Sequence, residues 1–308
     1  MYQYTYSITI THYNAPNLLA RMLSSIPERD DIQVIVVDDC STEENKAILS
    51  SLKHKNLEIV FSPKNYGAGF ERNVGFEHVK GKWLIACDCD DLFAKGAFDI
   101  LDKYRDSDFD YICYCVKYLD SELKPIGIQL RSDASVRKFL KEKTKNAVKY
   151  FKFWNTEPWN KLISVDFLRK NKIQWEPCRI NVDVLFSYRV ALKAKKYSAI
   201  SDELYYFVGD GNSVTRKERS VEREFEFYLA AQKRNGFFKI LGYGYPFSRP
   251  DFMYLPFLLK KRGISETFQF YKLRKKRWND VLDARKLFVP YLDGIDLNHV
   301  LDIPENLS

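Results

Sequence analysis

The chain has 308 residues, of which 45% are apolar, and it carries a formal net charge of +8 at pH 7. This length allows one large domain or two smaller ones, and the apolar content allows a substantial core. No apolar run approaches the roughly 18 residues of a membrane-spanning helix, and the first residues lack the basic start and apolar stretch of a signal peptide. These features argue against an integral membrane or secreted protein, so we expect a cytoplasmic one.

The first 115 residues alternate between strand and helix patterns. Short apolar or β-branched runs predict strands at 6–11, 32–37, 57–61, 83–87 and 109–116. Turn and capping residues predict helices that begin near Pro16, Ser41, Gly69 and Gly96. This alternation favours a doubly wound, mostly parallel α/β sheet. Further helices are expected at 138–151 and 182–195, and residues 216–308 are predicted to be mostly helical.

Carboxylates follow two of the predicted buried strands. Asp38 and Asp39 end the run 32–37, and three acids at positions 88, 90 and 91 end the run 83–87. Ligands bind at the carboxyl edge of a parallel sheet, and clustered acids repel one another unless a cation neutralises them. The second cluster therefore predicts a divalent cation held against phosphates. Asp38 and Asp39 are equally compatible with acids that stabilise a helix start. The similar run 106–110 precedes a strand, which predicts a solvated turn.

Two further segments have both a functional and a structural interpretation. Residues 65–75 form a glycine-rich turn before a helix, where Gly67 allows close backbone approach to a phosphate and Arg72 offers paired donors to a diphosphate. An ordinary loop with a solvated arginine fits the same pattern. Asp183 lies at a predicted helix start capped by Asn181. It is either a first-turn acid that stabilises the helix or a general base that faces a cleft.

Several other chemistries lack their motifs. The four histidines form no H-E-x-x-H, and neither a G-x-S-x-G elbow nor a Walker loop occurs. The cysteine pairs 87/89 and 113/115 have the spacing of one strand face, which favours buried thiols over a structural zinc site. No RRM, KH or OB signature occurs, and the acidic first 100 residues, with 10 basic and 14 acidic side chains, argue against a nucleic-acid track.

Taken in order, these segments resemble the family 2 glycosyltransferases with the GT-A fold. The matching pieces are residues 10–14, 36–42, 65–75, 81–91, 159–162, 181–186 and 205–215, so the resemblance covers roughly residues 5–215. It implies a GT-A domain at 1–215, with a nucleotide-sugar-binding half at 1–115 and an acceptor half at 116–215. A basic, helical C-terminal region at 216–308 would follow this domain.

The resemblance also implies an activity and its cofactor. The chain would be an inverting glycosyltransferase of the hexosyltransferase type, which moves a sugar from a nucleotide-sugar, with a UDP-sugar favoured. The acceptor would be a hydroxyl of a glycan or of a polyprenyl-diphosphate-linked oligosaccharide in surface polysaccharide synthesis, such as capsule or lipopolysaccharide. Mn²⁺ or Mg²⁺ would bind Asp88 and Asp90, the D-x-D motif, with Asp90 as the main ligand. Asp183 would be the general base, although Val182 replaces the glutamate that precedes it in the family.

The remaining positions follow from the same resemblance. The nucleotide-sugar-binding residues would be Thr11, Tyr13, Asp38, Asp39, Gly67, Arg72, Asn73, Asp88 and Asp90. The acceptor-side residues would be Asp91, Trp159, Asn160 and Lys161. The alternative is a catalytically inactive nucleotide-sugar-binding or regulatory protein of the same fold, against which the intact acids argue.

The C-terminal region also has two interpretations. Residues 101–308 contain 39 basic and 27 acidic side chains, and the stretches 259–262 and 272–278 mix cations with apolar residues. Such stretches attract anionic lipid head groups, which predicts peripheral association with the inner face of the membrane. A solvated helix face fits the same composition.

Overall fold

The computed structural model describes residues 2–176, 181–209, 220–242, 251–287, 295 and 300–304. The chain divides into two compact units, Met1–Gly211 with His299–Ser308, and Asn212–Asn298. The predicted domain boundary at residue 215 lies outside the described residues. The division of the first domain at residue 115 stays a prediction.

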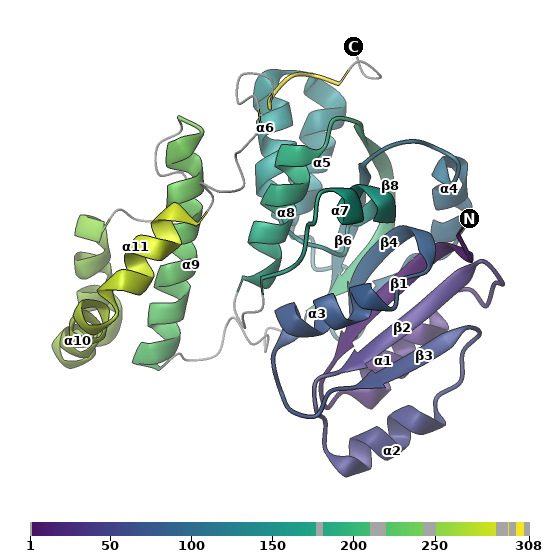
Figure 1. The fold of residues 1–308 in the computed structure, drawn as a ribbon, viewed down its shortest axis with the longest axis horizontal. Helices are drawn as coiled ribbons and strands as arrows, with labels where there is room; N and C mark the ends of the chain where they lie inside the picture. The colour runs from purple at the N-terminus through teal and green to yellow at the C-terminus, as the bar shows by residue number, and fades with distance from the viewer. Residues whose placement is uncertain are drawn as a thin grey trace. The chain divides into compact units, whose positions relative to one another are not determined.

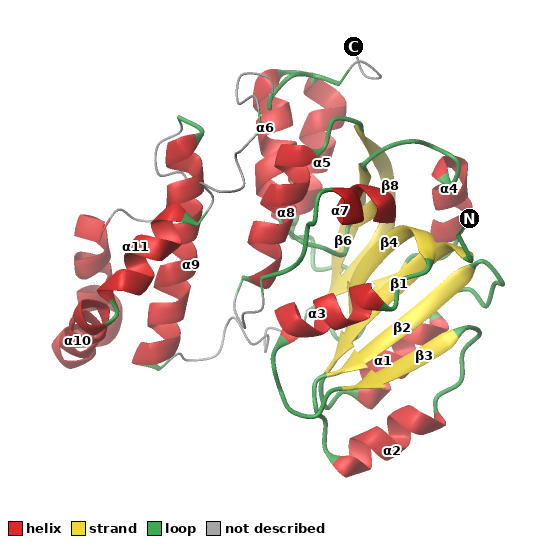
Figure 2. Cartoon of the chain, in the orientation of Figure 1, coloured by secondary structure: helices red, strands yellow, loops and turns green. Residues whose placement is uncertain are grey.

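The first unit is built on a single sheet with helices on both of its faces (Figures 1 and 2). The strands are β1 (Tyr4–His12), β2 (Ile32–Asp38), β3 (Leu57–Phe61), β4 (Gly81–Asp88), β5 (Leu92–Phe93), β6 (Tyr111–Leu119), β7 (Lys161–Ser164) and β8 (Tyr197–Val208). Their order is β3-β2-β1-β4-β7-β6-β8-β5. All neighbouring strands are parallel except those that pair with β7 or β5. This sheet confirms the predicted fold class.

Helices cover both faces of the sheet. The helices α1 (Pro16–Ser24), α2 (Glu43–Ser51) and α4 (Ala97–Leu101) pack on one face. The helices α3 (Ala68–Glu77), α5 (Arg131–Glu142), α6 (Lys145–Trp154), α7 (Val165–Lys170) and α8 (Val182–Lys193) pack on the other. Strand β2 is buried along its whole length between these layers, as expected for a continuous apolar run in a parallel sheet.

Two local expectations about helices were wrong. One concerns the extent of a helix and the other the residue that caps a helix. The helix expected at 138–151 is two helices, since Lys143 adopts a left-handed conformation (φ 42°) and Thr144 caps α6 by accepting from the N–H of Ala147. The cap of α2 is Thr42 rather than Ser41. Ser41 donates its hydroxyl to Asp38 instead.

The second unit contains the helices α9 (Val221–Ile240), α10 (Asp251–Lys276) and α11 (Trp278–Lys286). Their apolar core includes Phe225, Tyr228, Leu258 and Phe270. The helical C-terminal region is thus confirmed. Among the described residues, no helix has the length and hydrophobicity needed to cross a membrane.

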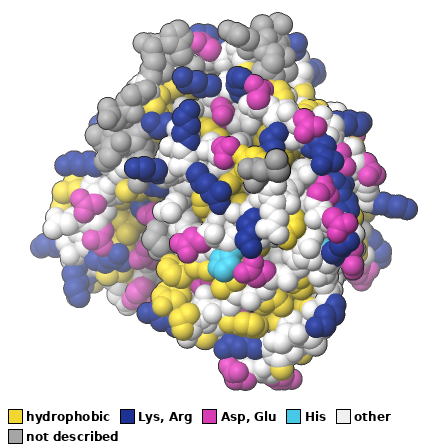
Figure 3. Space-filling model, turned by 45° about the vertical axis from the view of Figure 1, so that its right-hand side comes forward, with side chains coloured by type: hydrophobic (Ala, Val, Ile, Leu, Met, Phe, Trp, Pro, Cys, Tyr) yellow, Lys and Arg dark blue, Asp and Glu magenta, His cyan; other side chains and the backbone are white. Residues whose placement is uncertain are grey.

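Charged side chains of both signs are intermixed on the face of the molecule seen in Figure 3. A track for a nucleic-acid backbone needs cations gathered along one path. On the face drawn in Figure 3, cations are interspersed with acids rather than gathered along one path.

Candidate active site

The candidate site lies where β1, β2 and β4 end side by side. The parallel register pairs His12 of β1 with Asp38 of β2, and Thr11 of β1 with Asp88 of β4. The acids that follow the two apolar runs therefore meet at one edge of the sheet, which is the edge where ligands bind in such folds.

Asp38 is enclosed by hydrogen-bond donors at the end of β2. His12 donates from Nδ1 to Asp38 Oδ1 at 2.8 Å, since its Nε2 accepts from the N–H of Ala15 at 3.0 Å. Ser41 donates both its N–H and its hydroxyl to the same carboxylate. Burial by itself raises the pKa of Asp38, but these donors outweigh it, and the net pKa is lowered. Asp38 thus fixes the turn after β2 as a carboxylate, and its contact with a nucleotide stays a prediction.

Asp39 connects this turn to the glycine-rich loop. Its carboxylate accepts the N–H groups of Tyr66 at 2.7 Å and Gly67 at 3.0 Å. Gly67 has a φ of 92°, a conformation that favours glycine. Next to Asp39, burial and the neighbouring acid raise the pKa of Glu71 to about 7, and Ser62 donates to Glu71. The loop 65–67 is therefore held at the end of β2 by its backbone.

Arg72 joins the predicted metal ligand to the predicted base. Its buried guanidinium donates to Asp88 Oδ1 at 2.7 Å and forms an ion pair with Asp183 Oδ1 at 3.1 Å. The sequence predicts Arg72 near a diphosphate, and the structure adds that both carboxylates share its charge. Three elements, α3, β4 and α8, meet in this cluster. Such a buried set of charges is tolerated because each acid faces a cation.

Asp183 receives a second partner that the sequence analysis missed. Trp175 donates its indole N–H to Asp183 Oδ1 at 3.2 Å, and its ring stacks on Phe186 with centroids 3.8 Å apart. Burial raises the pKa of Asp183 to about 6, and Arg72 limits this rise. The side chain is nevertheless 25% exposed, so it combines a raised pKa with access to solvent. This is the combination expected of a general base.

Asn73 supports this arrangement from α3. Its side-chain amide donates to the carbonyl of Trp175 at 2.9 Å and accepts the N–H of Trp175 at 2.8 Å. Asn73 therefore positions Trp175, and through it Asp183. Its predicted contact with a nucleotide-sugar stays a prediction.

The acids of the D-x-D turn have three different environments. Asp88 is 35% exposed, Asp90 is exposed, and Asp91 is fully buried. Asp91 accepts the N–H of Val208 at 2.8 Å, and burial raises its pKa well above the usual range. Its carboxylate thus lies inside the protein and attaches β8 to the turn, and its role on the acceptor side stays a prediction.

The other residues predicted on the acceptor side lie together, just before β7 and at its first residue. Trp159 stacks on Tyr205 with centroids 5.4 Å apart, and Asn160 and Lys161 are buried beside it. Lys161 donates to Asn160 at 3.1 Å; burial lowers the pKa of Lys161, and nearby acids, including Asp183, oppose that shift. Of these three residues, Lys161 thus lies near enough to Asp183 for the two charges to interact. Their contact with an acceptor stays a prediction.

Thr11, near the end of β1, and Tyr13, directly after this strand, differ in exposure. Thr11 is half-buried beside Asp88, whereas Tyr13 is 53% exposed. An exposed aromatic ring at this edge can stack on a base. The structure thus leaves Tyr13 accessible at the place where the sequence predicts a nucleotide.

The chain's own carboxylates suit a cation that is shared with a ligand. In the described parts of the chain, no group of three or more His, Cys, Asp or Glu side chains is arranged to hold a metal. Mg²⁺ is usually held by one or two carboxylates together with substrate phosphates. Asp88 and Asp90 fit that requirement, since both reach the surface.

The chain is similar in sequence to known proteins. The model of the family described as glycosyl transferase family 2 matches residues 7–171. Two curated relatives are the poly(ribitol-phosphate) β-N-acetylglucosaminyltransferase TarS of Staphylococcus aureus, 24% identical, and the poly(ribitol-phosphate) β-glucosyltransferase of Bacillus spizizenii, 28% identical. Each match covers 66% of this chain but only 35% or 32% of the relative. The chain thus spans about a third of the length of these relatives.

The fold is shared with solved structures. The crystal structure of S. aureus TarS 1–349 in complex with UDP-GlcNAc matches 97% of this chain and 88% of that chain. The TM-score is 0.59 and the sequence identity is 18%. At this identity the match concerns the fold alone.

Proposed function

The chain belongs to the family 2 glycosyltransferases, and from this premise we propose that it transfers a sugar from a nucleoside-diphosphate sugar to a hydroxyl of a cell-surface glycan. The observation that carries the proposal is the cluster in which Arg72 pairs with both Asp88 and Asp183. This cluster joins a donor-side carboxylate to a carboxylate with a raised pKa at the ligand-binding edge of the sheet.

We assign the role of general base to Asp183. The acceptor hydroxyl would attack the anomeric carbon while the bond from that carbon to the diphosphate breaks, and the hydroxyl proton would pass to Asp183. Because the contacts of Arg72 and Trp175 both fall on Oδ1, we place proton transfer at Oδ2. A single displacement of this kind inverts the anomeric centre.

The donor side would hold the diphosphate. Asp88 and Asp90 would bind Mn²⁺ or Mg²⁺, which supplies positive charge to the leaving diphosphate when bound. The loop around Gly67 and the exposed ring of Tyr13 would contact the nucleotide. We favour a UDP-sugar as the donor, and the UDP-GlcNAc in the solved TarS structure supports this choice.

The acceptor would be a polymer of the cell surface. Two relatives are named for poly(ribitol-phosphate), which supports an acceptor chain that carries both hydroxyls and phosphates. A polyprenyl-diphosphate-linked glycan of a capsule or lipopolysaccharide belongs to the same proposal, since it combines the same two groups.

A panel of nucleotide-sugars tests the donor assignment. We expect one UDP- or GDP-sugar to raise the thermal midpoint of unfolding in the presence of Mn²⁺, and to raise it less when the metal is chelated, because a ligand that binds only the folded state stabilises it. The measurement is a thermal shift with and without Mn²⁺ for each nucleotide-sugar. Stabilisation without any sugar transfer would favour the inactive nucleotide-sugar-binding protein, and no stabilisation by any member would refute the donor site.

We further propose that the second unit binds the surface of anionic membranes through α10. Four exposed apolar side chains lie along this element, Leu255 (39%) and Leu259 (42%) before a break in the helix at Gly263, and Ile264 (81%) and Phe268 (61%) after it. Lysines accompany them, and the Nζ of Lys272 lies 4.5 Å from the ring of Phe268. Exposed apolar residues among cations are typical of helices that lie in the membrane interface, where each basic residue contributes about 1 kcal/mol.

Co-sedimentation of the full chain with phosphatidylglycerol vesicles tests this surface. We expect Ile264→Ser combined with Phe268→Ser to lose most of the binding, because it removes the apolar contact and keeps the charge. Leu123→Ser combined with Ile128→Ser is the matched control, since these side chains are 41% and 59% exposed on the first unit. Equal losses in both double variants would contradict the proposal.

A further inference from the structure

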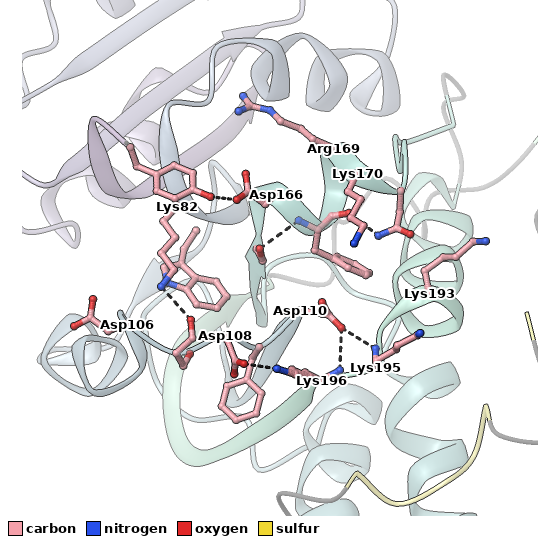
Figure 4. Close-up of a pocket in the computed structure, with 17 residues that line it drawn as sticks. Lys82, Asp106, Asp108, Asp110, Asp166, Arg169, Lys170, Lys193, Lys195 and Lys196 are labelled. Atoms are coloured by element: carbon pink, nitrogen blue, oxygen red, sulfur yellow. Dashed lines mark hydrogen bonds and ion pairs between the residues drawn. The ribbon is translucent and has the colours of Figure 1, made fainter. Parts of the chain in front are cut away.

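A large cavity lies in the first unit at the edge of the sheet opposite the candidate active site. Its volume is about 1070 Å³ (Figure 4). The lining residues 106–110 directly precede β6, Lys195 and Lys196 directly precede β8, and Lys82 lies at the start of β4. Since these strands run in the same direction, their first residues share one edge. We call this space the lysine cavity.

The charge of the lysine cavity is positive. Six cations line it, namely Lys82, Arg169, Lys170, Lys193, Lys195 and Lys196, against the four carboxylates of Asp106, Asp108, Asp110 and Asp166. In Figure 4, Lys170, Lys193 and Lys195 lie on one side of the cavity and Asp106 on the other. Within the described part of the chain, the cavity thus has an excess of two positive charges and a basic side.

Three of the four carboxylates are engaged with other groups of the cavity wall. Asp108 pairs with Lys196, and Asp166 accepts the hydroxyl of Tyr2. Asp110 accepts the backbone N–H groups of Lys195 at 2.7 Å and Lys196 at 2.9 Å. These contacts occupy the carboxylates, but they do not involve the ammonium groups of Lys170 or Lys195. A ligand in the cavity would therefore meet more positively charged groups than negatively charged ones.

A smaller hollow continues the lysine cavity along the same edge. It has a volume of about 620 Å³, shares Tyr2, Asp166 and Arg169 with the larger space, and adds Lys80. The two together form an elongated surface with cations along it. A single phosphate is much smaller than this surface, whereas several repeats of a chain would occupy it.

From these observations we infer that the lysine cavity anchors the phosphate groups of an anionic polymer acceptor, away from the hydroxyl that receives the sugar. The inference rests on the proposed function, because that function makes the polymer the acceptor. Binding of the polymer to the cavity does not itself require sugar transfer. Strand β4 has eight residues, so the two edges are about 27 Å apart. Only a chain of several repeats reaches both sites, and short acceptors would not use the cavity.

A nucleic acid is the other polyanion that this surface has to be tested against. Its binding without sequence preference relies on aromatic side chains on which bases stack. Four aromatic residues line the wall: Trp83 and Phe167 are 0% and 6% exposed, Phe109 is half-buried and Tyr2 is 38% exposed. Among these four rings only that of Tyr2 is well exposed, and its hydroxyl is bound to Asp166. One exposed ring offers no succession of stacking surfaces, which favours a polymer with phosphates and without bases.

Binding of fluorescent long-chain inorganic polyphosphate to the full chain tests the inference without donor or transfer. We expect Lys170→Gln, Lys193→Gln and Lys195→Gln combined to weaken binding at least tenfold and to make the salt dependence shallower by about two in a log–log plot. Lys53→Gln, Lys103→Gln and Lys141→Gln combined is the matched control, since these exposed lysines lie outside the cavity and change the net charge equally. Unchanged thermal midpoints would verify that both triple variants fold.

The outcomes separate this inference from the proposed function. Equal weakening in the two triple variants would overturn it, because net charge alone would then explain binding. Tighter binding of an oligothymidylate of equal charge, or equally good competition by free inorganic phosphate, would also overturn it. Retained donor stabilisation in the cavity variant, together with a raised KM for long but not for short acceptors, would support it. A failure of the donor panel would leave the polyphosphate result unaffected.

Discussion

Asp183→Asn is expected to lower kcat by a factor of about 10² to 10⁴, the usual contribution of a positioned general base, while donor binding stays close to that of the wild type. The substitution keeps the shape of the side chain and an oxygen for Trp175, which donates to Oδ1. It removes the negative charge that accepts a proton. Arg72 keeps its partner Asp88, so the donor side stays assembled. The measurement pairs single-turnover kinetics with the donor-induced thermal shift.

The pH profile provides an independent test of the same residue. The base must be deprotonated, and partial burial of the Asp183 carboxylate raises its pKa to about 6. The rate should therefore be constant above this pH and fall tenfold for each unit below it, as the carboxylate takes up a proton. Asp183→Asn should remove this slope from the residual rate.

A matched variant separates the catalytic role from helix stabilisation. Asp99 is an exposed first-turn acid of α4, so Asp99→Asn removes the same kind of helix-stabilising charge, which is worth about 0.3–1 kcal/mol. We expect its kcat to be unchanged. A near wild-type rate in Asp183→Asn would show that another group is the base.

The parts of this site that the sequence predicted are those fixed by strand ends. An apolar run followed by acids places Asp38 and Asp88 at one edge, and the register of β1 with β2 and β4 brings them together. The apolar run 57–61 also coincides with β3, because it too is a local pattern. Periodicity and turn residues are local signals, so they specify elements and their ends well.

The contacts between distant segments were not predictable in this way. Asn73 and Trp175 are 102 positions apart, and their paired hydrogen bonds depend on how α3 meets the loop before α8. The pairing of Arg72 with both Asp88 and Asp183 likewise depends on how α3 lies against β4 and α8. The sequence shows which residue types are present, but no local pattern in it predicts which residues from distant segments come into contact.

Three strands were missed for a related reason. Strands β5 and β7 have only two and four residues, too few for an alternating pattern. Strand β8 has exposed residues at 201–203 and pairs with β6 through a register shift at Tyr114 and Cys115. Its sequence therefore looks interrupted, although the strand is continuous. The contact of Asp91 with Val208 was missed for the same reason, since Val208 is on β8.

Asp90→Ala is expected to lower transfer by at least about 100-fold, because a bound cation contributes several kcal/mol to stabilising the leaving diphosphate. Asp90 is the informative member of the D-x-D pair. Asp88 also holds Arg72, so its replacement would disturb the base as well as the donor. Asp90 is exposed at the turn after β4, and its removal should change the free energy of unfolding by no more than about 0.5 kcal/mol.

The measurement is the Mn²⁺-dependent thermal shift with the donor, together with the rate of transfer. We expect Asp90→Ala to lose the metal-dependent part of the shift and to recover some activity at high Mn²⁺, since Asp88 remains as a ligand. Asp106→Ala is the matched control: it belongs to the similar run 106–110, is exposed, and lies at the opposite edge of the sheet. Its donor binding should be unchanged.

The comparison of Asp90→Ala with Asp106→Ala tests whether the proposed metal site depends on the position of the aspartates in the fold or only on their spacing in the sequence. Both runs place alternating aspartates next to a strand, but only the run 88–91 follows its strand at the carboxyl edge, beside Arg72 and Asp183. A cation shared with a diphosphate needs that neighbourhood, because the developing charge, the base and the acceptor hydroxyl must meet there. If Asp90→Ala kept both the metal-dependent shift and transfer within a few-fold of the wild type, the edge of the sheet would not be where the donor is held.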